Sequence, residues 1–305
     1  MTGPAAIGDL TISPLGLGTM SLTGRGTWGE PADPAAARAL LRRAAGLGVQ
    51  LFDTADSYGP AVAESLVREA LHPYEGLLIA TKGGFRRHGP HEWEADCRPE
   101  SLRAACEASL ARLGVERIDL YQLHLVDARV PVEESVGALT ELREEGKIRH
   151  IGVCNVDLGR LERARRVAEI VSVQNRFSLA ERTSADVLAR CGEAGIAFIA
   201  WAPLAKGFLP GASGALAATA AAHGATPGQV ALAWIVRRPG AFAIPGTASA
   251  RHLEENVGAL AVALTDEEAD ALERDPLLGY RARQLARKAR MRAGRIKAGV
   301  RKVRR

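Results

Sequence analysis

The chain has 305 residues, and 47% of them are apolar, which suffices for one large barrel-sized core or for two ordinary domains. It lacks an apolar run of roughly eighteen residues, and its first residues lack a basic region followed by an apolar core, so we expect neither a membrane span nor a signal peptide. The four cysteines show no zinc or Cys-x-x-Cys spacing, which predicts reduced thiols, no metal site and a cytoplasmic location.

The N-terminal part of the chain predicts a hairpin, a strand, a helix and a second strand. Residues 5–13 alternate around a Gly-Asp pair, which is typical of a short β-hairpin ahead of the main fold. Residues 15–18 are expected to form the first strand of that fold. After a glycine-rich loop, Pro34 begins an amphipathic helix that ends at Gly48, and a strand at 49–53 follows at once.

Strand-length apolar runs and helical patterns alternate through the rest of the chain. The apolar runs fall at residues 77–82, 118–124, 148–154, 171–174, 196–201 and 241–244. Helical patterns begin near residues 61, 99, 131, 157, 184, 226 and 251, several of them at a proline or at an Asp or Thr cap. The stretch between Lys82 and Pro99 is expected to be a glycine-rich loop, and the stretch from Gly207 to Thr226 a short loop.

Eight strand–helix units in one chain are typical of a closed parallel barrel rather than of an open sheet. An open sheet that binds a dinucleotide would carry Gly-x-Gly-x-x-Gly after its first strand, whereas Thr19-Met20-Ser21 follows Gly16-Leu17-Gly18 here. We therefore predict an α/β protein with a single (β/α)8 TIM barrel over residues 1–280. A short N-terminal hairpin precedes the barrel, and a basic tail over residues 281–305 follows it.

Four polar side chains stand at or just after the ends of three neighbouring predicted strands, namely Asp53, Tyr58, Lys82 and His124. Barrel enzymes hold their chemistry at strand C-terminal ends, so we expect the four to meet at one mouth. A phenol is a poor acid near neutral pH, and a neighbouring cationic amine would lower its pKa. Asp53 would keep Lys82 charged, and His124 would orient a carbonyl oxygen. The set suits proton donation to an oxygen that is gaining negative charge.

Each of these residues also has a structural interpretation. An aspartate at a strand end is often a turn or helix cap, and a lone lysine is often solvated. A histidine after an apolar strand is often a structural residue with its hydrogen bonds satisfied. The occurrence of all four at three successive strand ends favours the catalytic interpretation.

Seven short motifs, in a fixed order, carry a family resemblance. They are Phe52-Asp53-Thr54-Ala55 with Tyr58-Gly59, Thr81-Lys82-Gly83, Tyr121-Gln122-Leu123-His124, Ile151-Gly152-Val153-Cys154-Asn155, Val173-Gln174-Asn175, Ala202-Pro203-Leu204 and Ile244-Pro245-Gly246-Thr247 with Glu255-Asn256. Over residues 12–260 the chain resembles the aldo-keto reductases. The resemblance implies a (β/α)8 barrel without a metal and a nicotinamide cofactor extended across its mouth. It also implies that Asp53, Tyr58, Lys82 and His124 are a catalytic tetrad with Tyr58 as the acid.

The resemblance further implies a set of cofactor-binding residues. Asn155 and Gln174 would hydrogen-bond the nicotinamide carboxamide, and Trp201 would stack on the nicotinamide ring. Positions around the pyrophosphate and adenosine match Leu204, Gly207, Gly246, Thr247, Glu255 and Asn256. Arg251 or His252 would favour NADPH through the adenosine 2′-phosphate, with NADH as the alternative cofactor.

Aromatic side chains on predicted loops suggest the substrate. Trp28, Phe85, Trp93 and Phe177 would line a pocket suited to a small aromatic or apolar aldehyde as the carbonyl substrate. The alternative is that they are local packing anchors. The overall pattern also resembles the branch that includes pyridoxal reductases, which makes pyridoxal a candidate.

The C-terminal tail differs in charge from the rest of the chain. The net charge of the chain is +5, but residues 281–305 hold 12 basic residues and no acidic one, which leaves 28 basic against 35 acidic residues elsewhere. Apolar residues spaced three or four apart predict an amphipathic helix, with a disordered tail as the alternative. Such a tail would contact an anionic surface, nucleic acid or another subunit, or would gate the substrate pocket.

Two other classes of function remain open from the sequence. One is a regulatory protein that binds NADPH with little turnover, resembling the β-subunits of potassium channels. The other is a lyase or aldolase that forms a Schiff base on Lys82. Asn155, Gln174 and Trp201 argue against a lyase, which would not need a nicotinamide site.

Overall fold

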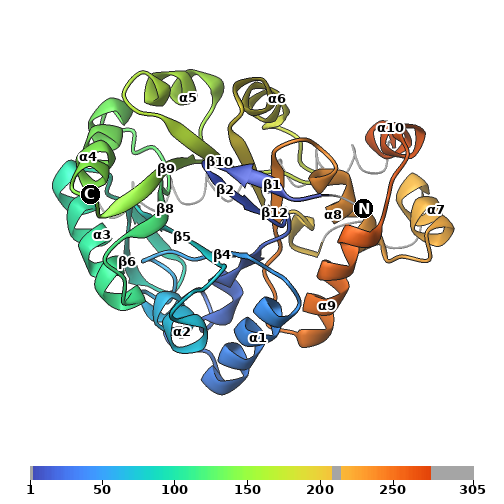
Figure 1. Cartoon of the computed structure of the whole chain (residues 1–305), viewed down its shortest axis with the longest axis horizontal. Helices are drawn as coiled ribbons and strands as arrows, with labels where there is room; N and C mark the ends of the chain where they lie inside the picture. Colours follow the sequence, from blue (N-terminus) through green and yellow to red (C-terminus); the bar gives the residue numbers. More distant parts are fainter. Residues whose placement is uncertain (1–2, 208–213, 276–305) are drawn as a thin grey trace, which may run out of the picture.

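A computed structural model describes residues 3–207 and 214–275. Its centre is one sheet of eight parallel strands, which are ordered in the sheet as they are in the chain. The strands are β3 (Leu17–Gly18), β4 (Leu51–Asp53), β5 (Leu78–Gly83), β8 (Ile118–Leu123), β9 (Ile148–Cys154), β10 (Ile170–Arg176), β11 (Ala197–Trp201) and β12 (Ala241–Ile244). Their long apolar runs are buried because helices cover the outer face of the sheet, as Figure 1 shows.

The first and last strands meet and close the sheet into a barrel. Parallel bridges join Leu15 to Ala243 and Gly18 to Gly246, and the Gly16 N–H donates to the Ala243 carbonyl at 2.9 Å. A Cβ atom at Gly16 would lie 2.8 Å from the Leu51 carbonyl oxygen, so this close approach requires glycine. The predicted (β/α)8 barrel is confirmed.

The helices form a ring around the barrel (Figure 1). They are α1 (Pro34–Gly46), α2 (Val62–Leu71), α3 (Pro99–Leu113), α4 (Val132–Glu144), α5 (Leu158–Arg165), α6 (Ala185–Ala194), α7 (Gly214–Ala222), α8 (Pro227–Val236), α9 (Ala250–Gly258) and α10 (Asp266–Arg274), with the short 3-10 turns η1 (Thr19–Leu22), η2 (Ala205–Gly207) and η3 (Ala259–Ala261). Among residues 3–207 and 214–275, no helix combines the length and the apolar character needed to cross a bilayer.

Two of the predicted helix starts have the side-chain cap contacts that their sequence suggests. The Asp157 carboxylate accepts a hydrogen bond from the Arg160 N–H at the start of α5. Thr226 and Gln229 form a reciprocal capping box at the start of α8, each side chain accepting from the other residue's backbone N–H. Both caps were predicted from the sequence, and both are confirmed.

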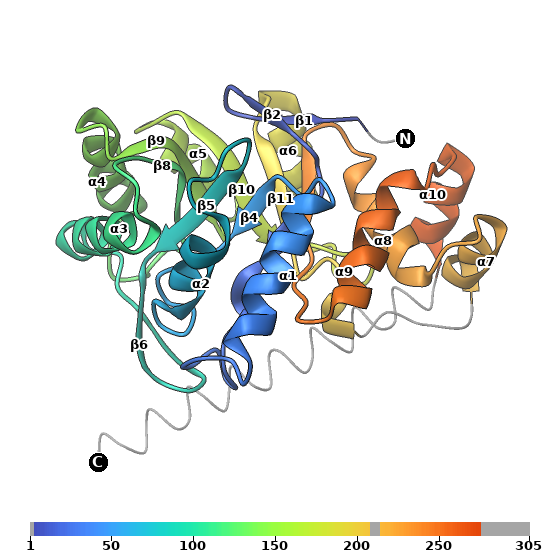
Figure 2. The same cartoon turned by 60° about the horizontal axis from the view of Figure 1, so that its bottom comes forward.

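The N-terminal hairpin closes one end of the barrel. Strands β1 (Ala5–Ile7) and β2 (Leu10–Ile12) pair antiparallel, as predicted. Ile7 and Ile12 are buried in one cluster with Leu51, Leu78 and Leu120, which lie in the first half of their strands. Figure 2 shows this hairpin at the opposite end of the barrel from β6 (Phe85–Gly89). The C-terminal ends of the strands therefore face the other way and are free of it.

Two expectations about loops are wrong. The stretch between Lys82 and Pro99 forms an antiparallel hairpin of β6 and β7 (Glu92–Ala95). Half-buried and exposed residues alternate along most of β6, and polar and apolar side chains alternate along β7. The stretch from Gly207 to Thr226 contains α7, whose alanine-rich sequence favours a helix. Helix α10 was not expected either. The basic tail lies outside the described residues.

Candidate active site

Asp53, Tyr58, Lys82 and His124 lie together at the C-terminal end of the barrel. Asp53 ends β4, Lys82 is the penultimate residue of β5, and His124 directly follows β8. These three strands are neighbours in the sheet, so their parallel ends bring the side chains to one edge. Tyr58 reaches the same place from the turn after β4, where its N–H donates to the Ala55 carbonyl.

Lys82 and Asp53 form a buried ion pair. Nζ of Lys82 lies 2.6 Å from Oδ1 of Asp53, and the two side chains are 0% and 3% exposed. Lys82 also donates a hydrogen bond to the Thr54 carbonyl at 2.7 Å. Burial by itself would lower the pKa of Lys82, but the Asp53 carboxylate outweighs it and the net pKa is raised. The amine is therefore charged at neutral pH.

Two amide side chains hold the Asp53 carboxylate from inside the barrel. Gln174 donates from Nε2 to Oδ2 of Asp53 at 2.6 Å, and Gln122 donates to the same oxygen at 3.4 Å. Gln122 was not among the site residues predicted from the sequence. A fully buried polar side chain within the apolar run of β8 was the signal that could have found it.

Tyr58 places its hydroxyl beside the charged amine. The hydroxyl oxygen lies 3.5 Å from Nζ of Lys82, and the side chain is buried. Burial raises the pKa of Tyr58 to about 12, although the charge of Lys82 acts in the opposite direction. The charge of Lys82 does lower the pKa of the Tyr58 phenol, as expected. Burial raises that pKa by more, so the net change is upward.

His124 is held neutral and has one ring nitrogen without a partner. Burial, with the nearby charge of Lys82, lowers its pKa well below the usual value. Nδ1 of His124 is buried and makes no hydrogen bond within the described residues. The ring lies edge-on to Tyr58, with 5.8 Å between centroids. A neutral imidazole in this position is able to share a hydrogen bond with an oxygen that reaches the Tyr58 hydroxyl.

An aromatic cluster adjoins Tyr58 and His124. The ring centroid of Phe85 lies 4.8 Å from that of His124 and 5.2 Å from that of Trp93. Trp93 lies 6.5 Å from Tyr58 and is one of the few large apolar side chains left exposed. The guanidinium of Arg87 lies over the rings of both Trp93 and Trp28, and so links Trp28 to this cluster.

Phe177, expected to line the substrate pocket, lies in the core instead. Its side chain is 2% exposed and stacks on Trp234 with 5.5 Å between ring centroids. It also packs edge-on against Phe198. Successive side chains of a strand point to opposite faces of the sheet. Gln174 faces the barrel interior, so Phe177, three residues further along, faces the surrounding helices. The expectation for Phe177 is wrong.

Three of the expected cofactor residues lie beside the four polar side chains. Asn155 has φ of 57°, a conformation that asparagine tolerates, and it donates from Nδ2 to the His124 carbonyl at 3.0 Å. Its Oδ1 accepts a hydrogen bond from Nε1 of Trp201 at 3.0 Å, which fixes the half-buried indole ring. Nε2 of Gln174 donates to Oδ2 of Asp53 at 2.6 Å and to Oε1 of Gln122 at 3.5 Å, which leaves its carbonyl oxygen for a ligand.

The other expected cofactor residues gather around the end of β12 and the start of α9. Gly246 and Thr247 follow β12, and the Ser249 hydroxyl caps α9. Arg251 and His252 are exposed in the first turn of α9, and they are 2.9 Å apart from Nη2 to Nε2. The remaining residues of the set lie in α9 or in and beside η2, namely Glu255, Asn256, Leu204 and Gly207.

Glu255 and Leu204 approach one another at the start of α8. Glu255 accepts a hydrogen bond from the Thr226 hydroxyl at 2.8 Å. A Cβ atom at Gly228 would lie 3.6 Å from Oε1 of Glu255 and 3.9 Å from the Leu204 side chain. An exposed arginine in the first turn of a helix, where the helix dipole favours negative charge, is suited to a phosphate. Over residues 3–207 and 214–275, no group of three His, Cys, Asp or Glu side chains could hold a metal ion.

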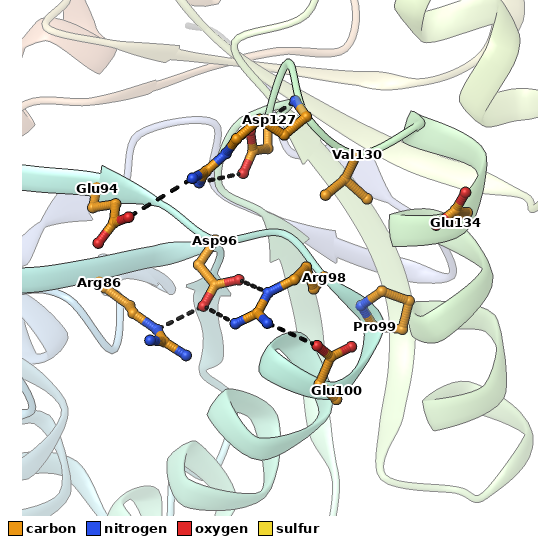
Figure 3. Close-up of a pocket in the computed structure, with 10 residues that line it drawn as sticks. Arg86, Glu94, Asp96, Arg98, Pro99, Glu100, Asp127, Val130 and Glu134 are labelled. Atoms are coloured by element: carbon orange, nitrogen blue, oxygen red, sulfur yellow. Dashed lines mark hydrogen bonds and ion pairs between the residues drawn. The ribbon is translucent and has the colours of Figure 1, made fainter.

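A separate pocket lies beside the β6–β7 hairpin, with a volume of about 560 Å³. Figure 3 shows its charged lining, in which Asp96 accepts from Arg86 and Arg98. Asp127, in the same lining, is paired with Arg129. None of the four clustered polar residues lines it. The pocket is lined by Arg86, Glu94, Asp96, Arg98, Pro99, Glu100, Asp127, Arg129, Val130 and Glu134.

Comparison with known proteins decides the family. Residues 14–274 match the model of the aldo/keto reductase family. The chain belongs to this family. An uncharacterized oxidoreductase of Schizosaccharomyces pombe is 44% identical over 266 residues, which is 87% of each chain.

Two further relatives of this aldo/keto reductase carry more specific names. Pyridoxine 4-dehydrogenase of Escherichia coli is 39% identical over 275 residues, covering 88% of this chain and 96% of the relative. An aldo-keto reductase of Klebsiella pneumoniae, solved in complex with NADPH, superposes with a TM-score of 0.77 at 30% identity. That match covers 90% of this chain and 95% of the solved one.

Proposed function

We propose that this protein reduces the carbonyl group of an aldehyde or ketone with NADPH, and that Tyr58 is the general acid. The observation that carries the proposal is the buried Lys82–Asp53 ion pair, with the Tyr58 hydroxyl 3.5 Å from the charged amine. Reduction of a carbonyl places negative charge on its oxygen, which must receive a proton. A phenol beside a fixed cation is suited to supply that proton.

Each residue of the cluster has one task in the proposed reaction. Tyr58 donates its proton to the carbonyl oxygen, and Lys82 stabilises the phenolate that remains. Asp53 keeps Lys82 charged and in place, since the pair is closed to solvent. His124 is neutral and hydrogen-bonds the same carbonyl oxygen, which orients it toward Tyr58.

The residues at the barrel mouth fit a nicotinamide dinucleotide. NADPH supplies the hydride when it is bound. Trp201 offers a ring face that Asn155 holds in place, and the start of α9 offers the exposed Arg251 at a helix N-terminus. The solved Klebsiella pneumoniae relative in complex with NADPH supports this cofactor.

The charge state of Lys82 disfavours the lyase alternative. A Schiff base forms on a neutral amine, and the nearby Asp53 carboxylate keeps the Lys82 amine protonated. The contacts of Lys82 with Asp53 and the Thr54 carbonyl also occupy donors that a nucleophilic amine would have to release.

The proposed substrate is a small aromatic aldehyde, with pyridoxal as the leading candidate. Phe85 and Trp93 form an apolar aromatic wall beside Tyr58 and His124, and a flat aromatic ring packs well against such a wall. The relative named pyridoxine 4-dehydrogenase supports pyridoxal, because oxidation of pyridoxine at carbon 4 is the reverse of pyridoxal reduction.

The proposal is tested by following NADPH oxidation over a panel of carbonyl compounds that includes pyridoxal, benzaldehydes and short aliphatic ketones. We expect turnover with the aromatic aldehydes. NADPH binding without turnover on any member would instead favour the regulatory alternative, and absence of NADPH binding would refute both.

The two directions of the reaction are expected to respond differently to pH. With a Tyr58 pKa of about 12 and His124 neutral, the acid form is fully present over the ordinary pH range, so reduction should be nearly constant between about pH 6 and about pH 9. Alcohol oxidation needs the phenolate, whose population rises about tenfold per pH unit below that pKa. Measured pH profiles of kcat/KM in both directions check this. A reduction rate that falls below pH 7 would contradict a neutral His124.

Arg251 is expected to set the preference for NADPH over NADH. Replacing it with alanine should weaken NADPH binding about tenfold, which is the loss of one charged hydrogen bond, and leave NADH binding unchanged. Arg43→Ala is the matched control, because Arg43 is a nearby exposed arginine whose guanidinium is paired with Glu254 of the same helix as Arg251. Calorimetric titration with both cofactors measures the effect. Equal losses for NADPH and NADH would exclude a contact with the 2′-phosphate.

A further inference from the structure

Arg87, in β6, uses every N–H group of its guanidinium on a backbone carbonyl. An arginine side chain has five such donors in a rigid fork. The measured contacts run from Nε to Glu92 at 2.9 Å, from Nη1 to Thr27 at 2.9 Å and Ser57 at 2.7 Å, and from Nη2 to Gly26 at 3.1 Å and Gly89 at 3.2 Å. Within the described residues Arg87 makes no ion pair. Its whole hydrogen-bonding capacity therefore goes to main chain.

These carbonyls belong to three segments that are distant in the sequence. Gly26 and Thr27 lie in the segment after η1, Ser57 lies in the turn after β4, and the other two belong to the β6–β7 hairpin. The segments also contact one another directly, since Trp28 and Gly59 form a parallel bridge and the His91 N–H donates to the Gly26 carbonyl at 3.1 Å. Arg87 lies where all three meet.

The guanidinium of Arg87 lies over the rings of two tryptophans. The guanidinium carbon of Arg87 lies 3.7 Å from the ring centroid of Trp93 and 5.7 Å from that of Trp28. Such contacts fix the positions of both rings relative to the cation. Trp93 is in turn the aromatic neighbour of Tyr58 and Phe85.

Two residues at the same junction have a strained backbone. Thr27 and His91 have φ of 56° and 63°, in the left-handed region that residues with a side chain rarely adopt. Such conformations persist only where the surroundings hold them. Arg87 hydrogen-bonds the carbonyl of Thr27 itself and those of Gly26 and Gly89, one and two residues from the strained positions.

We propose that Arg87 is the positioning residue that assembles the substrate-binding face, by holding three loop segments so that Tyr58, Trp28 and Trp93 face one carbonyl compound. Ser57, which accepts from Arg87, directly precedes Tyr58, so the guanidinium fixes the backbone from which the acid projects. The inference rests on the proposed reductase activity for its kinetic consequence. Its structural content is independent of that activity.

Lysine cannot replace this function. A lysine ammonium has three donors on a flexible stem, so it cannot donate to five carbonyls at once. The neighbouring Arg86 provides a matched comparison, because it points to the other side of the hairpin and pairs with Asp96 at 2.6 Å (Figure 3). The Arg86 side chain is more than half exposed, and the buried Asp96 keeps its ion pair with Arg98 when Arg86 is replaced, so we expect the loss of Arg86 to cost little.

The test compares Arg87→Met with Arg87→Lys and the control Arg86→Met, in protein labelled with 5-fluorotryptophan. The chain has four tryptophans, so fluorine NMR gives four resonances, which single Trp→Phe variants assign. In Arg87→Met, the Trp28 and Trp93 resonances are expected to shift or broaden, while the core Trp234 resonance stays in place. With an aromatic aldehyde, kcat/KM should fall about tenfold or more, while the NADPH Kd changes less than about twofold. Arg86→Met should match the wild type in every readout.

Two outcomes would overturn the proposal. One is an Arg87→Met protein whose Trp28 and Trp93 resonances and kcat/KM equal those of Arg86→Met. The other is a shift of all four resonances together with a loss of NADPH binding, which would indicate a general structural role. If Arg87→Met does not fold, the same measurements on Arg87→Lys replace it, because lysine keeps the positive charge but lacks the planar guanidinium with its five donors. If the wild type reduces no carbonyl, the proposed function fails, and the fluorine spectra still decide the role of Arg87.

Discussion

Replacing Tyr58 with phenylalanine is expected to lower kcat/KM for carbonyl reduction by about a thousandfold, while NADPH binds as tightly as before. The substitution removes only the hydroxyl oxygen, which lies 3.5 Å from Nζ of Lys82 and carries the transferable proton in the proposed reaction. The ring and its edge contacts with His124 and Trp93 remain. Steady-state kinetics with an aromatic aldehyde and a fluorescence titration with NADPH measure the two effects separately.

Tyr121→Phe is the matched control for this substitution. Tyr121 lies in the neighbouring strand β8, is fully buried, and its hydroxyl has no hydrogen-bond partner within the described residues. The same chemical change therefore removes a buried hydroxyl without touching the proposed proton path. Activity close to that of the wild type is expected. If Tyr58→Phe and Tyr121→Phe lost the same small fraction of activity, Tyr58 would not be the acid.

The clustering of Asp53, Lys82 and His124 was predictable because it follows from the alternation of strands and helices. Each residue stands at the end of an apolar run, and parallel strands that follow one another in the chain lie side by side in a barrel. The period-two pattern of a buried strand then decides which side chains enter the barrel. Phe177 shows the limit, because it lies just past the end of β10. Because Phe177 was predicted to lie on a loop, its side chain was expected at the barrel mouth. The alternation of side chains along β10 instead places it against the helices.

The role of Arg87 was not predictable from the sequence. Its five acceptors are main-chain carbonyls, which are identical in every residue, so no side-chain pattern marks them. The sequence predicts a loop where the β6–β7 hairpin lies, because the glycines of this stretch hide a short alternation of exposed and half-buried residues. The pKa of Tyr58 likewise depends on how deeply its ring is buried, which is a property of the assembled fold.

Replacing Lys82 with methionine is expected to abolish reduction and also to destabilise the fold by about 3–5 kcal/mol. Methionine fills the volume of the side chain but leaves the Asp53 carboxylate buried beside an apolar group, with only the amides of Gln174 and Gln122 as donors. An unpaired buried charge costs far more than the ion pair contributed. Urea unfolding followed by circular dichroism measures the change in the free energy of unfolding.

The double variant Lys82→Met/Asp53→Leu separates the two effects of Lys82. Removing both charges is expected to recover most of the lost stability, because a buried ion pair contributes little net free energy over an apolar pair of similar volume. Activity should not return, since no cation then stabilises the Tyr58 phenolate. The raised pKa of Lys82 also predicts how the stability depends on pH.

The stability that the charged Lys82 amine contributes is fully present below its unfolded pKa of about 10.4, and is lost only as the pH rises toward the pKa of the folded state. The difference in stability between wild type and Lys82→Met should therefore stay constant from neutral pH to about pH 9. A double variant as unstable as the single one would show that the ion pair itself, rather than the unpaired carboxylate, governs stability at this site.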